Sequence, residues 1–231
     1  PVTRTTCVRA AAFKADERSP IVTATYLLAL SEAIRSLPVL SLVGDEAETF
    51  YLPNGIGAIQ GGVYTGKYVS WRPVAPGDYN FALQHGRAFE RPVSAELILP
   101  DGSSAFQVDC GIRLHGSTYT RSRYRMTSKF SFRLYFRRDY GPKRLYYPLI
   151  PDAPVSDFDR IVLRAGQSDA VNPFLKDELG RRLQRDMSGD ACLGTFVNLF
   201  INGRYQGYYN PVERIDEKMF QSRFGRDLPW D

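Results

Sequence analysis

Ten lysines and arginines but a single acid, Asp139, lie between Arg113 and Arg144 of this 231-residue sequence. The loop at the start of this basic segment, GSTYTRSR from Gly116, adds a glycine and several hydroxyl groups. Glycine turns, hydroxyls and guanidinium groups are donors that bind phosphate oxygens in proteins. Three interpretations therefore compete: a nucleic-acid surface, a site for a small phosphorylated ligand, or a solvated sheet edge without a chemical role.

Strands should flank this loop, because apolar and polar residues alternate on both sides of it. Before the loop, Cys110 and Ile112 alternate with Arg113. After it, Lys129 and Arg133 fall on the face opposite four apolar side chains, which are Phe130, Phe132, Leu134 and Phe136. If the strands pair, Arg113, Lys129 and Arg133 can meet on one surface. The phenylalanines then occupy the buried face, which argues against a base-stacking platform and makes nucleic acid an unlikely partner.

Two hairpins are predicted where Asp-Gly and Asn-Gly pairs, Asp101-Gly102 and Asn202-Gly203, separate alternating runs. The N-terminal pair of strands would bury too little surface to be stable alone, so it should pack on another part of the protein. A Gly- and Pro-rich segment near forty residues long, 53–92, is expected to be a loop. The predicted strands lie within residues 4–12, 21–28, 39–44, 93–116, 158–166 and 195–215.

One main helix is predicted to begin at Asn172-Pro173, an N-cap followed by proline in the first turn, and to end at Gly189. Apolar residues recur every four positions within it and predict a buried stripe, formed by Leu175, Leu179, Leu183 and Met187. A second, shorter helix should begin near Asp216, whose side chain would cap it.

The composition is that of an ordinary globular protein, with 43% hydrophobic and 24% charged residues. A 13% share of aromatic residues and the short alternating runs favour β-rich architecture. We therefore predict an α+β fold, mainly antiparallel β-sheet with one principal packed helix. Two histidines and three widely spaced cysteines match no zinc-binding pattern. No run of about twenty apolar residues predicts a membrane span.

With these elements in place, the sequence resembles the spore coat protein H (CotH) family of atypical, kinase-like proteins. The segments GIRLHGSTYTRSR from Gly111 and SKFSFRLYF from Ser128 carry the resemblance, together with FLKDELGRRLQRDM of the predicted helix. The most specific match is the last hairpin, FVNLFINGRYQGYYNPVERID, where a dozen positions agree in order. Residues 1–28 resemble the end of a chitobiase-type β-sandwich that often precedes such domains in bacterial surface proteins.

The resemblance implies a kinase-like fold with an N-lobe sheet and one helix. We expect residues 1–30 to be the end of a β-sandwich module or an extension, and residues 31–231 to be the N-lobe portion without the catalytic C-lobe. The cofactors implied are ATP and Mg²⁺, and the acceptor would be a protein hydroxyl. The chain begins at Pro1 and reads as a piece of a longer protein, so we expect it to be inactive alone. An extracellular or cell-surface location is also expected.

Carried onto this sequence, the resemblance makes Lys129 the lysine that positions the nucleotide phosphates. Its alternative role is a solvated strand lysine. Arg113, Arg121 and Arg133 would add positive charge beside the phosphates. Arg113 and Arg133 could equally be held by Asp109 and Asp139, the commoner fate of strand arginines.

The helix and the last strand supply the remaining candidates. Glu178, or its neighbour Asp177, could hold Lys129 by an ion pair. Glu213 to Ile215 follow the last strand, where a linker would offer backbone groups to the adenine edge; the alternative is a turn into the next helix. A different function also stays open, that of a noncatalytic polyanion-binding or adhesion module, marked by a steep salt dependence of binding.

Overall fold

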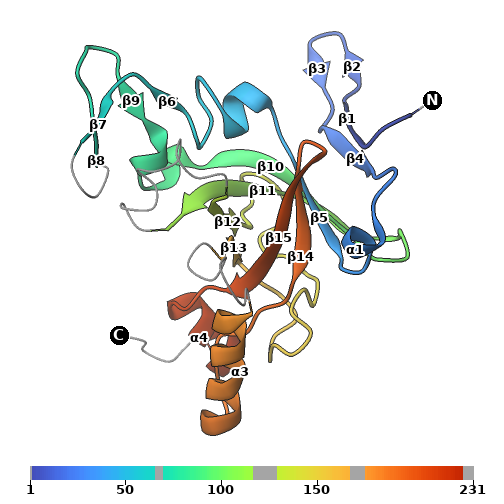
Figure 1. Cartoon of the computed structure of the whole chain (residues 1–231). Coiled ribbons are helices and arrows are strands. Elements are labelled where there is room, and N and C mark those ends of the chain that lie inside the picture. The colour runs from blue at the N-terminus through green and yellow to red at the C-terminus, as the bar shows by residue number, and fades with distance from the viewer. Residues whose placement is uncertain (1, 66–69, 117–128, 167–174, 226–231) are drawn as a thin grey trace.

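The computed structural model describes residues 2–65, 70–116, 129–166 and 175–225. A sheet with the strand order β10-β11-β12-β13-β15-β14-β5 closes into a barrel (Figure 1). Neighbouring strands are antiparallel, apart from β5 and β14, which are parallel. These strands are β5 (Val39–Val43), β10 (Arg91–Ile98), β11 (Ser104–His115), β12 (Ser131–Tyr135), β13 (Arg160–Arg164), β14 (Val197–Ile201) and β15 (Arg204–Glu213). The predicted α+β, mainly antiparallel fold class is confirmed.

The interior of the barrel is the main hydrophobic core, because one side chain of every alternating pair points into it. Cys110 and Ile112 of β11 and Leu134 of β12 belong to this core, as the alternation predicts. Burial raises the pKa of the Cys110 thiol far above its ordinary value. The opposite set of side chains, with Arg113 and Arg133 directly opposed across β11 and β12, faces outward.

Both predicted hairpins are present. Gly102 in the β10–β11 turn has φ 88°. At the β14–β15 turn, Asn202 and Gly203 have φ 48° and 77°, the pair of left-handed residues that a type I′ turn requires. These turns set the register, which decides the side chains that look out of the barrel.

The N-terminal strands β1 (Thr6–Ala10) and β4 (Val22–Tyr26) pair with each other and lie at the opposite end of the molecule from α3 (Figure 1). Beyond them, β2 (Phe13–Lys14) and β3 (Glu17–Arg18) form the hairpin tip. Thr25 ties the pair to the barrel, since its N–H donates to Glu96 Oε2 at 3.0 Å and its hydroxyl to Ser41 Oγ at 2.8 Å. The hairpin therefore packs on the barrel; its origin in a β-sandwich module stays a prediction.

The segment from residue 53 to 92 is built from short hairpins and helical turns. β6 pairs with β9 and β7 with β8, and two 3₁₀ turns lead into β10. A π-helical turn, η1, precedes the segment. The elements are η1 (Glu46–Phe50), β6 (Ile59–Gln60), β7 (Val63–Thr65), β8 (Ser70–Arg72), β9 (Tyr79–Asn80), η2 (Phe81–Leu83) and η3 (Arg87–Phe89).

The helices are α1 (Glu32–Arg35), α3 (Lys176–Ser188) and α4 (Glu217–Phe224). As predicted, Asp216 caps α4, accepting from the N–H groups of Lys218 at 3.0 Å and Met219 at 3.3 Å. Gly189 ends α3 with φ 79°, also as predicted. The predicted start at Asn172-Pro173 lies outside the described residues. Within the described ranges, no helix has the length and apolar character needed to cross a membrane.

The prediction that the leucines of α3 are buried is wrong. Leu175, Leu179 and Leu183 are more than half exposed and Met187 is 88% exposed, whereas Glu178 is 4% exposed. The polar face of α3 packs on the barrel because Glu178 binds groups there that solvent cannot reach. Periodicity identifies the two faces of this helix but not the one that is buried.

We therefore expect Leu183→Gln to change the free energy of unfolding by less than about 0.5 kcal/mol, as surface substitutions do. Leu163→Ala, in the barrel core at 0% exposure, should lower it by about 2–5 kcal/mol. Urea unfolding of both variants checks this. A loss of several kcal/mol for Leu183→Gln would mean that the leucine face is covered.

Candidate functional site

A cavity of about 440 Å³, the lysine cavity, opens on the outer face of the barrel beside α3. It lies where β11, β13 and β15 end and where β12 begins. Three predicted site residues, Lys129, Glu213 and Ile215, are in its lining. Other charged residues around it are Arg164, Asp177, Arg181 and Arg214.

Lys129 lies two residues before β12 and reaches across to β15. Its Nζ donates to the carbonyl oxygen of Tyr208 at 2.6 Å and lies 4.7 Å from the ring centroid of Tyr209. Burial lowers the pKa of Lys129. The ammonium group is thus held at the cavity wall by a carbonyl and an aromatic face, where an anion would offset its lost hydration.

Glu213 anchors the segment that follows β15. Its side chain is 3% exposed and pairs with Arg223 of α4, and it accepts from the N–H of Leu193 at 3.1 Å. Burial raises the pKa of Glu213, although Leu193 and Arg223 act in the other direction. Its backbone N–H donates to Leu193 and its carbonyl accepts from the Cys192 thiol. Ile215, by contrast, is 62% exposed at the cavity edge.

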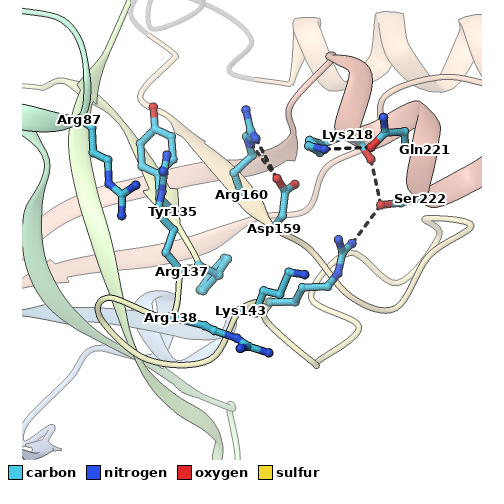
Figure 2. Close-up of a pocket in the computed structure, with 12 residues that line it drawn as sticks. Arg87, Tyr135, Arg137, Arg138, Lys143, Asp159, Arg160, Lys218, Gln221 and Ser222 are labelled. Atoms are coloured by element: carbon cyan, nitrogen blue, oxygen red, sulfur yellow. Dashed lines mark hydrogen bonds and ion pairs between the residues drawn. The ribbon is translucent and has the colours of Figure 1, made fainter. Parts of the chain in front are cut away.

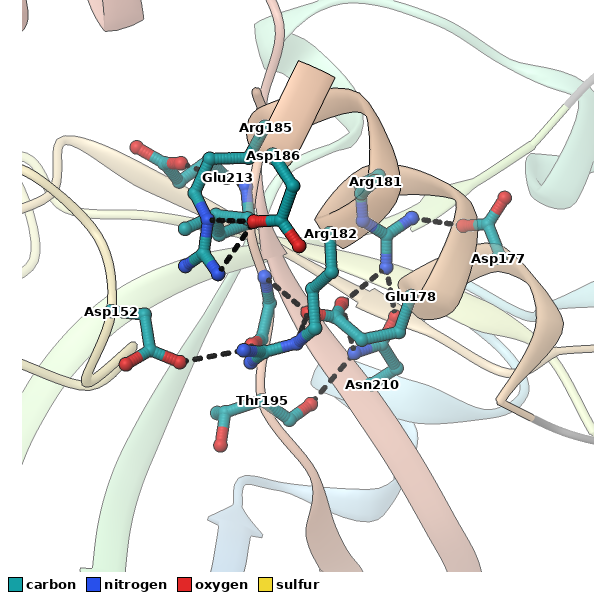
Figure 3. Close-up of polar contacts among 12 residues, drawn as sticks. Asp152, Asp177, Glu178, Arg181, Arg182, Arg185, Asp186, Thr195, Asn210 and Glu213 are labelled. Carbon is teal, nitrogen blue, oxygen red and sulfur yellow. Dashed lines mark hydrogen bonds and ion pairs between the residues drawn. The ribbon is translucent and has the colours of Figure 1, made fainter. Parts of the chain in front are cut away.

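A polar cluster fixes α3 to the barrel (Figure 3). Glu178 accepts from Arg181 Nη2 at 2.7 Å and from Arg182 Nε at 3.0 Å, both on its own helix. From the barrel side it accepts from the N–H of Gly194 at 3.3 Å and the amide of Asn210 at 3.2 Å. Burial alone would raise the pKa of Glu178, but these partners, Arg181 first, outweigh it and hold the pKa below its usual range.

The expected pair between Lys129 and Glu178 is therefore not what the structure shows, because two arginines and two barrel groups occupy the Glu178 carboxylate. Arg181 connects Glu178 with the lysine cavity, which it lines. Asp177 is engaged by Arg164 and Arg181. The sequence held a signal for this arrangement, since arginines three and four residues after a glutamate lie beside it on a helix.

Arg113 and Arg133 line a neighbouring hollow of about 360 Å³, the tyrosine cavity, built around Tyr135. The guanidinium carbons of Arg113 and Arg133 lie 4.3 and 5.8 Å from the Tyr135 ring centroid, and that of Arg137 lies at 4.9 Å. Burial lowers the pKa of Arg133, with Arg214 and Arg113 adding to the effect. This hollow shares His115, Gly116 and Arg214 with the lysine cavity.

The counter-charge for these arginines is Glu90, whose carboxylate is completely buried. It lies 3.6 Å from Nε of Arg113 and 3.2 Å from Nε of Arg137. The suggested partners Asp109 and Asp139 do not take this place, and Asp139 pairs with Arg87 instead. No motif marks Glu90 in the sequence, so sequence reasoning missed it.

Two glycines make room for the buried carboxylates. A Cβ atom on Gly111 would lie 2.6 Å from Glu90 Oε1, and one on Gly194 would lie 2.6 Å from Glu178 Oε2. Real Cβ atoms do not approach other atoms so closely, so both positions are restricted to glycine unless the carboxylates move. Gly111 is the first residue of the motif GIRLHG, which gives that motif a steric meaning.

The structure thus brings Lys129, Glu213 and Ile215 to one cavity and Arg113 and Arg133 to the adjoining one. Glu178 stands behind the lysine cavity, and Arg121 lies outside the described residues. Across the described ranges, no group of three or more His, Cys, Asp or Glu side chains converges as a metal site would require.

An α+β barrel with a basic cavity beside its packed helix is the class of protein that these observations define. The sequence model of one protein family, described as CotH kinase protein, matches residues 112–228, just over half of the chain. The chain belongs to the CotH kinase family. The matched region begins in β11 and includes β12, α3 and the β14–β15 hairpin, and therefore most of the lining of both cavities. No curated protein matches the chain.

Proposed function

We propose that this chain provides the phosphate- and adenine-facing side of an ATP site in a CotH-family protein kinase that phosphorylates protein hydroxyls. The observation that carries this proposal is the position of Lys129 in one cavity with the segment that follows the last barrel strand. A lysine on the sheet and a linker at its end are the parts with which kinases hold the two ends of a nucleotide.

The residues present fit the phosphate end of ATP. Lys129 has a pKa lowered by burial, so an anionic phosphate oxygen would favour its charged form. Arg214 lines the same cavity and shares the next one with Arg113 and Arg133. Negative charge on the triphosphate would therefore meet several cations on one wall.

At the adenine end, the backbone of Glu213 is already used, because its N–H and carbonyl bind Leu193 and Cys192. The adenine contacts therefore fall to Arg214 and Ile215, the next residues along the cavity edge. Glu178 acts as a positioning residue in this proposal: it orients Arg181 toward the cavity and keeps α3 against the barrel.

The residues that the structure describes do not fit Mg²⁺ in the same way. Mg²⁺ prefers carboxylate oxygens and water, and the two acids in the cavity lining, Asp177 and Glu213, are both paired with arginines. No step is therefore assigned to a metal. ATP would supply the γ-phosphoryl group, and the chain would contribute mainly by positioning the phosphates and neutralising their charge.

Lys129→Ala is expected to weaken ATP binding about 10- to 100-fold, since a hydrogen bond to a charged group contributes about 1.5–3 kcal/mol. Isothermal titration of ATP into each protein measures the change, and thermal unfolding checks that the fold is kept. Lys14→Ala, at an exposed lysine of β2, is the matched control. Equal affinity of Lys129→Ala and the unsubstituted protein would reject the proposed site, as would an equal loss in the control. Where phosphoryl transfer is measurable, Lys129→Ala should abolish it.

A further inference from the structure

A third hollow, the basic cavity, lies beyond the tyrosine cavity and has a volume of about 600 Å³. It is bounded by η3, by residues 135–138 and 143–144 after β12, by the start of β13, and by α4. Seven of its twelve lining residues are lysine or arginine, and one, Asp159, is acidic. Figure 2 shows Arg87 and Tyr135 at one side and Lys218, Gln221 and Ser222 of α4 at the other.

Several of these cations are fixed in place by the protein. Arg144 donates to Ser222 Oγ at 3.0 Å and pairs with Asp157. Arg160 is held between Asp159 and Asp216, at 2.9 Å from each. The positive wall is thus rigid before any ligand arrives, which reduces the ordering that binding would require.

Arg138 and Lys143 differ from the other cations of this cavity. Both are exposed, and neither has an ion pair or hydrogen bond with any residue that the structure describes. The surrounding fixed charges repel them, so an anion that enters the cavity would gain two partners without breaking an existing pair.

The three cavities form one track along the outer face of the barrel. The basic and tyrosine cavities share Tyr135, and the tyrosine and lysine cavities share His115, Gly116 and Arg214. We call this track the basic furrow. A single hollow would suit a compact anion, whereas a furrow of three suits an extended chain that carries several negative charges.

The aromatic residues decide between two kinds of chain. Tyr135 and Phe136, which line the basic cavity, are each 3% exposed. Bases of single-stranded nucleic acid need exposed ring faces on which to stack. The furrow therefore offers charge without a stacking surface, which fits carboxylate or phosphate groups on a flexible polypeptide.

We propose that the basic furrow binds an acidic polypeptide segment, with Arg138 and Lys143 contacting its carboxylate or phosphoserine groups. Binding itself stands on the cavity alone. The assignment of the segment as the acceptor, whose hydroxyl would lie toward the lysine cavity, rests on the proposed kinase function. The substrate class is then a serine- or threonine-containing sequence with acidic flanks.

The test is fluorescence anisotropy with a labelled twelve-residue peptide of aspartate, glutamate and one serine, without nucleotide. Arg138→Glu combined with Lys143→Glu should weaken binding at least tenfold. Lys14→Glu combined with Arg18→Glu changes the net charge equally at two exposed residues of the N-terminal hairpin and should stay within twofold. Equal losses in both double variants, or no loss in either, would overturn the proposal.

Two further measurements separate this proposal from its neighbours. Lys129→Ala should lose ATP binding but keep peptide binding, so failure of the ATP site leaves the furrow intact as a peptide site. If ATP displaces the peptide competitively and Arg138→Glu with Lys143→Glu abolishes ATP binding, the basic cavity belongs to the nucleotide instead. Tighter binding of a single-stranded oligonucleotide with the same number of charges would assign the furrow to nucleic acid.

Discussion

Replacing Glu178 with alanine should lower the free energy of unfolding by about 3–5 kcal/mol, the usual effect of removing one partner from a buried ion pair. The carboxylate is 4% exposed and binds Arg181 and Arg182 together with Gly194 and Asn210 of the barrel. Its loss leaves two arginines and two barrel donors without an acceptor, and it releases the polar face of α3. Urea unfolding followed by circular dichroism measures the change.

Asp186→Ala is the matched control, because this acid is on the same helix, 63% exposed, and paired with Arg185. It should change stability by less than about 0.5 kcal/mol. An equal effect of the two substitutions would show that the Glu178 cluster does not hold the helix.

The Glu178 contribution should also depend on pH in a defined direction. Since the folded protein holds the pKa of Glu178 below its ordinary 4.5, the carboxylate stabilises the fold above that pH. The stabilisation is lost as the pH falls through the lowered pKa and the carboxylate is protonated. The difference in stability between the unsubstituted protein and Glu178→Ala should therefore be constant near neutral pH and shrink in acid. A difference that grows in acid would contradict this assignment.

Glu90→Gln should have two effects of opposite sign. It removes the buried negative charge between Arg113 and Arg137, which should lower the free energy of unfolding by about 2 kcal/mol. The value is below that for a fully buried pair, because these arginines are 20% and 32% exposed and water can reach them. The same change removes the internal counter-charge of the furrow, so affinity for the acidic peptide should rise several-fold.

Chemical unfolding and peptide anisotropy on one preparation measure both effects of Glu90→Gln. Glu32→Gln, an exposed glutamate in α1, makes the same change in net charge and should alter neither quantity. Stability that falls without a gain in peptide affinity would separate Glu90 from the furrow. A gain of equal size in Glu32→Gln would attribute the effect to total charge.

The strands and turns of this fold were predictable from the sequence because local rules decide them. Asn202-Gly203 fits the two left-handed positions of its turn, and the alternation from Phe130 to Phe136 identifies the side chains that enter the core. Closure of the barrel was not predictable in this way. It depends on parallel pairing of β5 with β14, which lie more than 150 residues apart and carry no local signal for each other.

The candidate site was predictable to the same extent. Alternation and the family motifs identified Lys129, Arg113 and Arg133, and pairing of β11 with β12 placed Arg113 opposite Arg133. The partners of Glu178 were missed because Gly194 and Asn210 come from distant strands, and the apolar stripe of α3 suggested the wrong face. Long-range polar contacts decided both questions, and no short window of sequence contains them.

Closure of the barrel limits how this protein can recognise a peptide. Each barrel strand has a hydrogen-bonded neighbour on both sides, so the barrel presents no unpaired edge to which an incoming peptide could add as a further strand. A partner must therefore be recognised at the barrel through its side chains, and its backbone contributes little to the choice. Sequences with the same charges in a different order would then bind nearly as well, and selectivity among acidic partners would come from the spacing of the charges.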